Sequence, residues 1–380
     1  MAQCSRCRCQ KRRSTLSTQA YLILTACGAG GSDRKAVAGM PDTVRTDTVQ
    51  AAERPVEAFT VALTGDIMMG TTYPDTMLPP DNGRALFRDV KEILASADLA
   101  LGNLEGTFCD SVPPRKRETE HTYLFRTPPE FAARLKEAGY DYLSMANNHT
   151  YDFGLRGVLS TERALDRLGI KYSGIRCRTA SAVLERGGVR FGLCAFGHNG
   201  YTMRHQELAT VREVLDSLRA MADIVVVSFH GGGEGKAFSH LPDSTERFLG
   251  EDRGSLRRFA RFCIDNGADI VYGHGPHVVR CVEMYKDRFI AYSLGNFCTP
   301  YAISIMGLSG YAPVIVVRTD RRGRFLDGRI HPFIQRKGLG PRRDTTGVVV
   351  RQIRMLTDTD VNGGGLRISD DGAVVPVEKE

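Results

Sequence analysis

Apolar runs of strand length alternate with amphipathic stretches of helix length between residues 59 and 350. This alternation predicts strands at residues 59–64, 99–101, 140–146, 224–229, 269–272 and 313–318, and helices at 84–96, 127–139, 155–168, 207–221 and 255–266. Two hairpins are predicted, 183–185 with 189–196 and 278–285 with 288–293. Strands that alternate with helices indicate a largely parallel sheet, to which hairpins add antiparallel strands. We therefore expect one α/β domain with two sheets over residues 59–350.

The two ends of the chain lack this periodicity. Residues 1–13 are basic, residues 14–26 are weakly apolar, and the stretch ends Leu24-Thr25-Ala26-Cys27. This order is typical of a secretory signal peptide over residues 1–26. The ending resembles the lipobox of bacterial lipoproteins, in which Cys27 would become the lipid-modified N-terminus. Residues 27–58 are then expected as a flexible tether, and residues 351–380 as a polar C-terminal tail.

Composition and charge narrow the class of protein. Of the 380 residues, 42% are hydrophobic and 25% charged, and no apolar run reaches the roughly 18 residues that span a bilayer. The net charge is +7, but residues 1–26 hold five basic residues and no acidic ones, so the rest carries only +2. Charge therefore gives no support for a nucleic-acid partner. The run Arg115-Lys116-Arg117 is either a solvated face or a basic lip for an anionic substrate.

Export would permit disulfides, although Cys194 and Cys263 lie in apolar runs and are expected as buried thiols.

Polar side chains directly follow five of the predicted strands. The clusters are Gly65-Asp66, Asn103-Leu104-Glu105, Asn147-Asn148-His149 with Asp152, His230 with Glu234, and His274-Gly275-Pro276-His277. Ligands of open α/β sheets bind at the carboxyl ends of the strands, so clusters on one rim can converge. Adjacent glycines (Gly65, Gly106, Gly231 and Gly273) are expected where the chain turns sharply or approaches a ligand closely. Carboxylates, an amide oxygen and imidazoles are ligands of divalent metal ions.

These clusters suit metal-assisted hydrolysis, which needs a cation and a side chain that moves protons. The expected metal ligands are Asp66, Glu105, Asn148, His230, His274 and His277. Glu105 would be the bridging carboxylate if two ions bind. His149 is the candidate for proton transfer or for stabilising a developing oxyanion, and Glu234 and Asn296 are candidates for orienting substrate or ligands. Each residue alone has an ordinary structural explanation, such as a loop cap for Asp66, so the prediction depends on their combination.

The ordered motifs resemble the CapA family of capsule-synthesis proteins, which is associated with poly-γ-glutamate capsule biosynthesis. The motifs are Thr64-Gly65-Asp66-Ile67, Gly102-Asn103-Leu104-Glu105-Gly106, Asn147-Asn148-His149 with Asp152 and Gly154, His230-Gly231-Gly232-Gly233-Glu234, Gly273-His274-Gly275-Pro276-His277 and Tyr292-Ser293-Leu294-Gly295-Asn296-Phe297. The resemblance covers roughly residues 59–300. It implies a fold similar to the calcineurin-like metallophosphoesterases, a four-layer α/β/β/α sandwich in a single main domain.

Against that wider superfamily the match is partial. Its first motif is Asp-x-His, whereas Met68 occupies the histidine position after Asp66. Its last motif separates two histidines by one residue, whereas two residues separate His274 from His277. One bound ion and two bound ions therefore stay alternatives, with Mn, Zn, Fe or Mg as candidate metals.

The resemblance implies an exported, lipid-anchored protein of capsule polymer biosynthesis with a metal-dependent hydrolase site. Its partners would be an anionic cell-envelope polymer, a capsule synthesis membrane complex, and the membrane through the lipid anchor. A phosphoester would suit the fold, and an amide of a γ-linked glutamate polymer would suit the family. The alternative is a non-catalytic polymer-binding or assembly subunit of a capsule synthesis and export complex, which the missing Asp-x-His imidazole favours.

Overall fold

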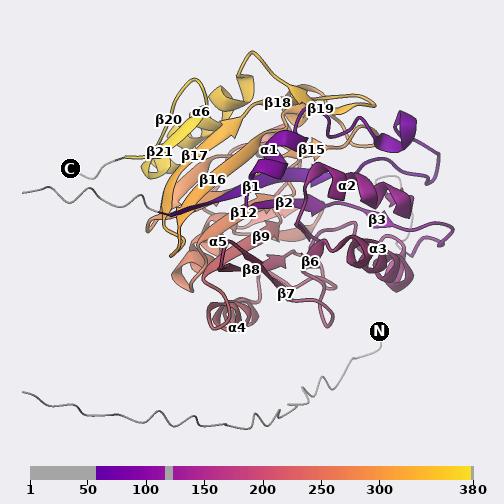
Figure 1. Ribbon diagram of the computed structural model, residues 1–380, viewed down its shortest axis with the longest axis horizontal. Coiled ribbons are helices and arrows are strands. Elements are labelled where there is room, and N and C mark those ends of the chain that lie inside the picture. The colour runs from indigo at the N-terminus through magenta and orange to yellow at the C-terminus, as the bar shows by residue number, and fades with distance from the viewer. Residues whose placement is uncertain (1–56, 116–122, 378–380) are drawn as a thin grey trace, which may run out of the picture. The chain divides into compact units, whose positions relative to one another are not determined.

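Two β-sheets packed face to face form the centre of the protein, and helices cover their outer faces (Figure 1). The computed structural model describes residues 57–115 and 123–377. The layers are helix, sheet, sheet and helix, as expected for an α/β/β/α sandwich in one main domain. This arrangement confirms the predicted fold class.

The larger sheet has nine strands and combines parallel with antiparallel pairs. Its order is β20 (Leu366–Ile368), β21 (Ala373–Pro376), β17 (Phe325–His331), β16 (Val314–Asp320), β1 (Ala58–Ile67), β2 (Leu99–Leu104), β5 (Tyr142–Ser144) and β6 (Lys171–Ser173), with β15 (Asn296–Cys298) paired to β1. The run from β1 to β6 is parallel, so the carboxyl ends of these strands share one edge.

The smaller sheet has six strands, and its central strands are also parallel. Its order is β13 (Val282–Tyr285), β14 (Arg288–Ala291), β12 (Ile270–His274), β9 (Ile224–His230), β8 (Val189–Phe196) and β7 (Ser181–Arg186). Three two-stranded sheets complete the strands: β3 (Thr107–Phe108) with β4 (Arg126–Thr127), β10 (Glu246–Phe248) with β11 (Glu251–Gly254), and β18 (Phe333–Arg336) with β19 (Gly340–Arg343).

The helices are amphipathic. All but the last pack on the outer faces of the sheets, and the last adds Val349, Val350 and Ile353 to the cluster between the two sheets. They are α1 (Lys91–Ser96), α2 (Ala132–Ala138), α3 (Gly154–Leu168), α4 (Leu208–Arg219), α5 (Leu256–Asp265) and α6 (Val348–Val361). Short 3₁₀ helices are η1 (Pro80–Gly83), η2 (Pro129–Phe131), η3 (Lys236–Phe238), η4 (Gly307–Gly310) and η5 (Asn362–Gly365).

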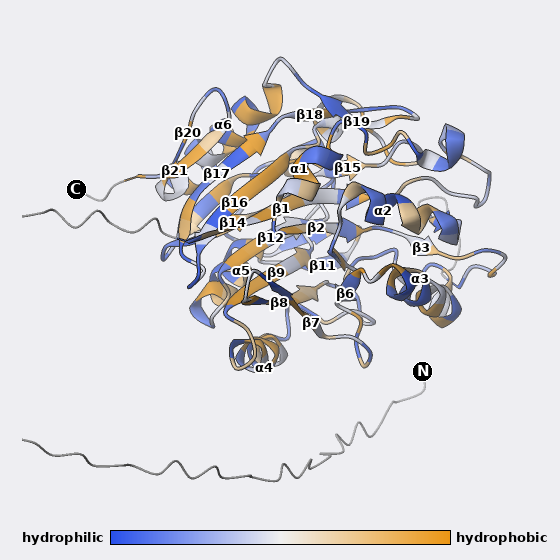
Figure 2. Cartoon of the chain, in the orientation of Figure 1, coloured by the Kyte–Doolittle hydropathy of each residue, from blue (hydrophilic) through white to orange (hydrophobic). Residues whose placement is uncertain are grey.

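Apolar side chains fill the spaces between the layers. Val61, Leu101, Phe191 and Val226 belong to the buried cluster between the two sheets. A second cluster lies between the larger sheet and α1 to α3, and a third lies between the smaller sheet and α4 and α5. Strands such as β9 are buried along their whole length, which explains their continuous β-branched sequence. In Figure 2 the central strands are mostly hydrophobic, whereas the helices carry both hydrophobic and hydrophilic residues.

Both predicted hairpins are present. Gly187 and Gly188 connect β7 to β8 with φ angles of 54° and 71°. Lys286 and Asp287 connect β13 to β14 with φ angles of 50° and 58°. Two central residues with positive φ are typical of the type I′ turn, whose twist matches that of the flanking strands.

Two predicted helices are shorter in the structure. The helix predicted over 84–96 begins only at Lys91, because the preceding residues form successive three-residue turns, such as Val90 N to Phe87 O at 3.1 Å. The helix predicted from Thr127 begins as 3₁₀ turns at Pro129. Thr127 does not cap it, since the Thr127 hydroxyl donates instead to the Gly70 carbonyl at 2.6 Å.

The segment predicted as a polar tail is part of the fold. α6 buries Ile353 and Leu356, and β20 and β21 then extend the edge of the larger sheet. Val374 on β21 is fully buried. The apolar positions of this segment are sparse along the chain but fall on one side of each element. Residues 351–377 therefore continue the domain that was predicted to end at residue 350.

Several sequence predictions fall outside the described residues. They are the signal peptide over 1–26, the lipidation site Cys27, the tether up to residue 56, and Lys116 and Arg117 of the basic run. In the described part, no helix combines the length and apolarity needed to cross a bilayer. The described cysteines are free thiols, and Cys194 and Cys263 are buried as predicted.

Candidate metal centre

Parallel strand pairing brings the predicted site residues into two short rows. In the larger sheet, Asp66 on β1 is in register with Asn103 on β2 and with Asn296 on β15. In the smaller sheet, His230 at the end of β9 is in register with His274 at the end of β12. Both rows lie at carboxyl ends of parallel strands, where side chains of different strands can meet.

Glycines allow the chain to approach itself closely beside these rows. A Cβ atom on Gly65 would lie 2.0 Å from the Gly295 carbonyl oxygen, and one on Gly273 would lie 2.3 Å from the Tyr292 carbonyl oxygen. Any larger residue would push the strands apart. The prediction of close approach is therefore confirmed for these two positions.

Asp66, Glu105 and His277 form a group that could hold a metal ion, because one ligand atom of each lies within 4.8 Å of the others. Nδ1 of His277 is 3.1 Å from Asp66 Oδ2, and Nε2 of His277 is 3.7 Å from Glu105 Oε1. The two acidic side chains are fully buried. His277 has a φ of 57°, a left-handed conformation that is unusual for a non-glycine residue. Such strain is concentrated at functional sites.

Two further imidazoles border the same carboxylates. Nε2 of His230 lies 3.9 Å from Glu105 Oε1. Nδ1 of His274 lies 3.2 Å from Asp66 Oδ1, without the alignment of a hydrogen bond. Each carboxylate therefore faces two imidazoles, and five of the six predicted metal ligands lie together.

Several of these buried polar atoms have no hydrogen-bond partner within residues 57–115 and 123–377. They are both carboxylate oxygens of Glu105 and both ring nitrogens of His230 and of His274. Leaving a buried polar group unsatisfied costs about 1–3 kcal/mol, and native proteins leave few such groups. A divalent cation would satisfy carboxylate and imidazole lone pairs together. The residues present therefore fit a metal ion.

The ionisation of these groups is strongly perturbed. Burial opposes the charge of Asp66, but the imidazoles of His274 and His277 outweigh it and hold its pKa well below the usual range. Burial, reinforced by the charge of Asp66, raises the pKa of Glu105 well above the usual range. Burial also lowers the pKa of His230 well below its usual value. Burial disfavours the charge of His277, yet Glu105 and Asp66 prevail and raise its pKa to about 10. Such opposed shifts are typical of functional sites.

Amide side chains hold the carboxylate of Asp66 and the imidazole of His277 in place. Asn103 donates from Nδ2 to Asp66 Oδ1 at 2.9 Å, and Asn147 donates to Asn103 Oδ1 at 3.0 Å. Asn296 Oδ1 lies 3.0 Å from His277 Nδ1. Since Nδ1 of His277 faces Asp66 and Asn296, its Nε2 is the nitrogen left for a cation. Sequence analysis assigned no role to Asn103 or Asn147, although both adjoin predicted ligands in the motifs.

Asn148 is the predicted ligand that lies on the loop after β5. It is half-buried, and its backbone carbonyl accepts a 2.9 Å hydrogen bond from the Tyr201 hydroxyl. Its role as a ligand stays a prediction. The neighbouring Asn147 is the residue whose side chain joins the Asp66 network.

His149 forms a pair with Asp152, with Nδ1 2.9 Å from Asp152 Oδ2. The same carboxylate oxygen accepts the Phe125 backbone N–H at 2.9 Å, and the His149 ring packs on the Phe125 ring at 4.3 Å. The ring is thus oriented from two sides. With Nδ1 bound to Asp152, Nε2 is the nitrogen that can exchange a proton with a substrate.

Glu234 faces the centre from the loop after β9. Arg253 donates to Glu234 Oε1 at 2.9 Å, and the charge of Glu234 contributes to the raised pKa values of Glu105 and His277. Its predicted role in orienting substrate stays a prediction.

Sequence analysis missed His198, whose ring stacks on that of His230 at 5.9 Å. Its Nε2 lies 3.5 Å from Glu251 Oε2. His198 comes two residues after the end of the predicted strand 189–196, so the same pattern of a polar residue after an apolar run could have identified it.

Comparison with protein families decides the class of this chain. Residues 60–301 match the family described as bacterial capsule synthesis protein PGA_cap. The chain belongs to this family. The match confirms the resemblance seen in the motifs, and it connects the chain with capsule synthesis, a process of the cell envelope.

Individual PGA_cap relatives are distant. The capsule biosynthesis protein CapA of Bacillus anthracis is 28% identical over 272 residues, which cover 67% of this chain and 63% of that protein. The PGA biosynthesis protein CapA of Bacillus subtilis is 27% identical over 256 residues, which cover 63% of each. The chain therefore spans less than two thirds of the length of either relative.

Solved structures with a similar arrangement are also distant. A phosphatase from Mycoplasma pneumoniae aligns with a TM-score of 0.47 and 12% identity, over 73% of this chain and 94% of that one. A putative 5'-nucleotidase from Staphylococcus aureus aligns with a TM-score of 0.42 and 14% identity, over 80% of this chain and 58% of that one.

Proposed function

We propose that this PGA_cap protein is a metal-dependent hydrolase that acts on an anionic polymer of the bacterial capsule. One observation carries the proposal: Glu105, His230 and His274 are fully buried, and the described part of the chain offers their side-chain polar atoms no hydrogen-bond partner. A purely structural site would be expected to pair such atoms, whereas a metal site leaves them for the ion.

The proposed ligands are Asp66, Glu105, Asn148, His230, His274 and His277. Glu105 Oε1 lies between the Nε2 atoms of His277 and His230, at 3.7 and 3.9 Å, which suits a carboxylate shared by two ions. Met68, buried where the wider superfamily has histidine, leaves the half of the site around Asp66 one imidazole short. We therefore propose one firmly held ion, with a second ion as the alternative. When bound, the cation would polarise the scissile group and lower the pKa of a water molecule.

The other residues of the site position and protonate the substrate. Asp152 holds His149 with Nδ1 directed at the carboxylate, so Nε2 would deliver or accept the proton on the reacting side. Asn103 and Asn296 orient Asp66 and His277. Glu234, held by Arg253, would orient the substrate at the mouth of the centre.

The family supplies the class of substrate. Its relatives are named for capsule and PGA biosynthesis, and an exported chain anchored through Cys27 would meet such a polymer at the cell envelope, beside the capsule synthesis membrane complex. The bond that is cut is either a phosphoester or a γ-linked amide. Turnover assays on substrates of each kind distinguish these alternatives.

Metal content tests the proposal directly. The full chain is purified without chelator, and its metals are counted by plasma emission. Asp66→Ala and His277→Ala are each expected to abolish metal uptake with an unchanged circular dichroism spectrum. His240→Ala is the matched control, because His240 is an exposed histidine paired with Asp360. Full metal occupancy in both site variants would reject the ligand assignment.

Turnover is then measured with added Mn²⁺ or Zn²⁺ on a chromogenic phosphodiester and on γ-linked polyglutamate. Hydrolysis of either substrate that disappears in His277→Ala would support the hydrolase. Binding of the polymer without hydrolysis under every metal would favour a non-catalytic assembly subunit instead.

A further inference from the structure

A basic cleft lies on the outer side of α3, beside the helix start that follows the His149–Asp152 pair. The cleft has a volume of about 430 Å³, close to the roughly 410 Å³ of a second charged cleft on α5. It is lined by Asp110, Ser111, Val112, Arg156, Leu159, Ser160 and Arg163. Arg156 and Arg163 are both exposed, and Asp110 is the one acidic residue of the lining.

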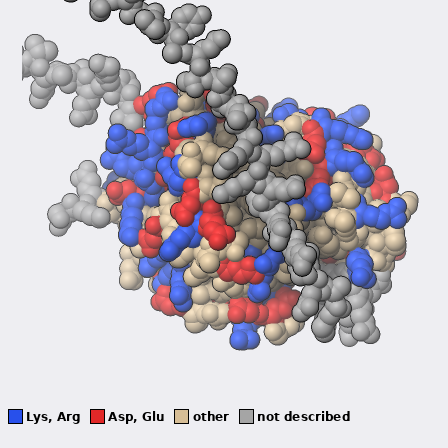
Figure 3. All heavy atoms as spheres, turned by 90° about the horizontal axis from the view of Figure 1, so that it is seen from below, with Lys and Arg blue, Asp and Glu red and all other residues tan. Residues whose placement is uncertain are grey.

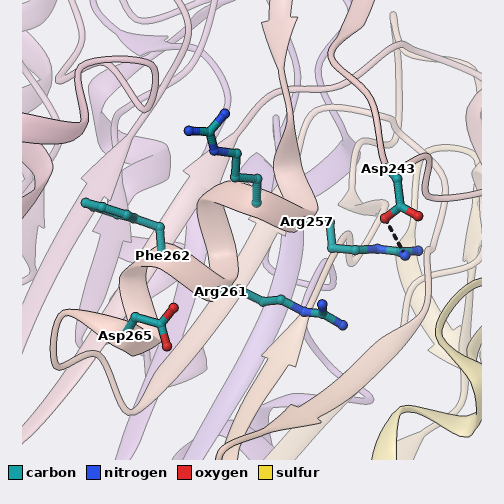
Figure 4. Close-up of a pocket in the computed structure, with 6 residues that line it drawn as sticks. Asp243, Arg257, Arg261, Phe262 and Asp265 are labelled. Atoms are coloured by element: carbon teal, nitrogen blue, oxygen red, sulfur yellow. Dashed lines mark ion pairs between the residues drawn. The ribbon is translucent and has the colours of Figure 1, made fainter.

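The arginines of this cleft differ from most arginines of the protein. Basic and acidic side chains are interspersed on the face shown in Figure 3, and many arginines form ion pairs. The α5 cleft follows that rule, because Arg257 pairs with Asp243 (Figure 4) and Arg261 pairs with Glu283. Within residues 57–115 and 123–377, Arg156 and Arg163 form no ion pair, so their charge is available to a ligand.

The cleft is connected to the catalytic pair through the start of α3. Arg156 is four residues beyond Asp152 in the sequence. The Arg115 backbone N–H donates to the Asp152 carbonyl at 2.8 Å. A Cβ atom on Gly154 would lie 3.2 Å from the side chain of Arg115, so that exposed arginine lies over the first turn of α3. Arg163 follows Arg156 by seven residues, which is two helical turns or about 10 Å on the same face.

We propose that this cleft is an exosite that binds a linear polycarboxylate, the part of the capsule polymer beyond the bond that is cut. The inference rests on the proposed function for the identity of the polymer. Arg115, Arg156 and Arg163 form a basic path from the catalytic pair into the cleft, and the hydroxyls of Ser111 and Ser160 can donate to carboxylate oxygens. Guanidinium groups bind carboxylates in a bidentate manner. The cleft would therefore favour long anionic chains over monomers.

Binding of a labelled polymer tests the exosite. Fluorescence anisotropy of fluorescein-labelled poly-γ-glutamate is recorded with the full chain in EDTA, so that no turnover consumes the probe. An exposed arginine–carboxylate contact contributes roughly 0.2–1 kcal/mol, so the loss of two such contacts in the double variant Arg156→Gln/Arg163→Gln should weaken binding about twofold to thirtyfold. Arg156→Lys/Arg163→Lys, which keeps both charges, should recover part of this loss. Added salt should weaken the parent more than the Gln variant.

Arg258→Gln is the matched control, because Arg258 is an exposed arginine that lines the α5 cleft. It should bind the polymer as tightly as the parent does. Equal affinities of the parent and the Arg156→Gln/Arg163→Gln variant would overturn the exosite, as would an equal loss in Arg258→Gln or the absence of binding by the parent.

The exosite and the hydrolase fail in different experiments. If the parent hydrolyses no substrate with any metal but binds the polymer through Arg156 and Arg163, the hydrolase is rejected and the exosite stands. If the parent hydrolyses the polymer and both arginine substitutions leave anisotropy unchanged, the exosite is rejected and the hydrolase stands.

Discussion

Replacing Glu105 by glutamine separates two effects on the free energy of unfolding: the burial of an acidic side chain and the binding of a metal ion. Glu105 is fully buried, neither carboxylate oxygen has a hydrogen-bond partner among the described residues, and burial raises its pKa well above the usual range. In metal-free protein, burial therefore disfavours the charged form of this carboxyl group. Glutamine is neutral and nearly isosteric, so Glu105→Gln should change the free energy of unfolding in EDTA by less than about 1 kcal/mol.

In the presence of metal, Glu105→Gln should no longer be as stable as the parent. A ligand at 100 times its Kd stabilises the folded state by about 2.7 kcal/mol. If the loss of one carboxylate ligand weakens metal binding about 100-fold, the same metal concentration stabilises the variant by only about 0.4 kcal/mol. The parent should therefore exceed Glu105→Gln by about 2 kcal/mol in metal, and the two should be nearly equal in EDTA.

Urea unfolding followed by circular dichroism, with and without Mn²⁺ or Zn²⁺, measures both differences. Glu283→Gln is the matched control, since Glu283 is a buried glutamate with partners, ion-paired with Arg261 and bonded to the Tyr292 hydroxyl at 2.6 Å. It should destabilise the protein by about 1–3 kcal/mol in either buffer, because it weakens the charge-assisted hydrogen bonds to the Tyr292 hydroxyl and to the partly exposed Arg261. It should leave the gain from metal unchanged. The reasoning is refuted if Glu105→Gln gains as much from metal as the parent, or loses as much in EDTA as Glu283→Gln.

Three further predictions follow from other contacts. Asp152→Asn should lower kcat about 100-fold or more with unchanged metal content, because His149 would lose the carboxylate that orients it; an unchanged kcat in steady-state assays would remove His149 from the proton-transfer step. Arg280→Met should destabilise the protein by about 3–5 kcal/mol in urea unfolding, because it leaves buried Glu246 without its partner, and a loss below about 1 kcal/mol would contradict this. Burial lowers the pKa of His205 to about 3, so this imidazole binds a proton more readily in the unfolded chain than in the folded protein. The free energy of unfolding should therefore fall by up to about 1.4 kcal/mol per pH unit as pH drops from about 6.5 towards 3. His205→Phe should flatten that dependence, and parallel stability curves for parent and variant would count against it.

Local sequence patterns were sufficient for most of the strands and for several residues that the structure brings close together. An apolar run that ends in a polar side chain identified Asp66, His230 and His274 because strand burial and strand termination depend on neighbouring residues. The same patterns misplaced element ends. The strands β1 and β2 extend to Ile67 and Leu104, so Asp66 is paired within its sheet and does not lie beyond it. Pairing with β15, over 200 residues later in the chain, decides where β1 ends, and no local pattern reports it.

Sequence patterns also failed where an element depends on a distant partner. β20 and β21 are short, and they are held because β21 pairs with β17 and β20 pairs with β21. Asn147 resembles a turn residue, and only the fold shows that its amide reaches Asn103 and the Leu104 carbonyl. His198 has the same local signal as His230, but its contact with that ring exists only after β8 and β9 pair.

The sequence by itself determined which residues could serve a metal centre and that they lie at strand ends, because residue type and apolar periodicity are properties of short segments. Only the tertiary structure decided that Asp66 and Glu105 of one sheet face His230, His274 and His277 of the other. Two stacked sheets bring those side chains together, and their burial removes the water that would otherwise satisfy them. The buried carboxylate and imidazole atoms that indicate a cation site thus arise from the packing of the two sheets, and no single motif contains this information.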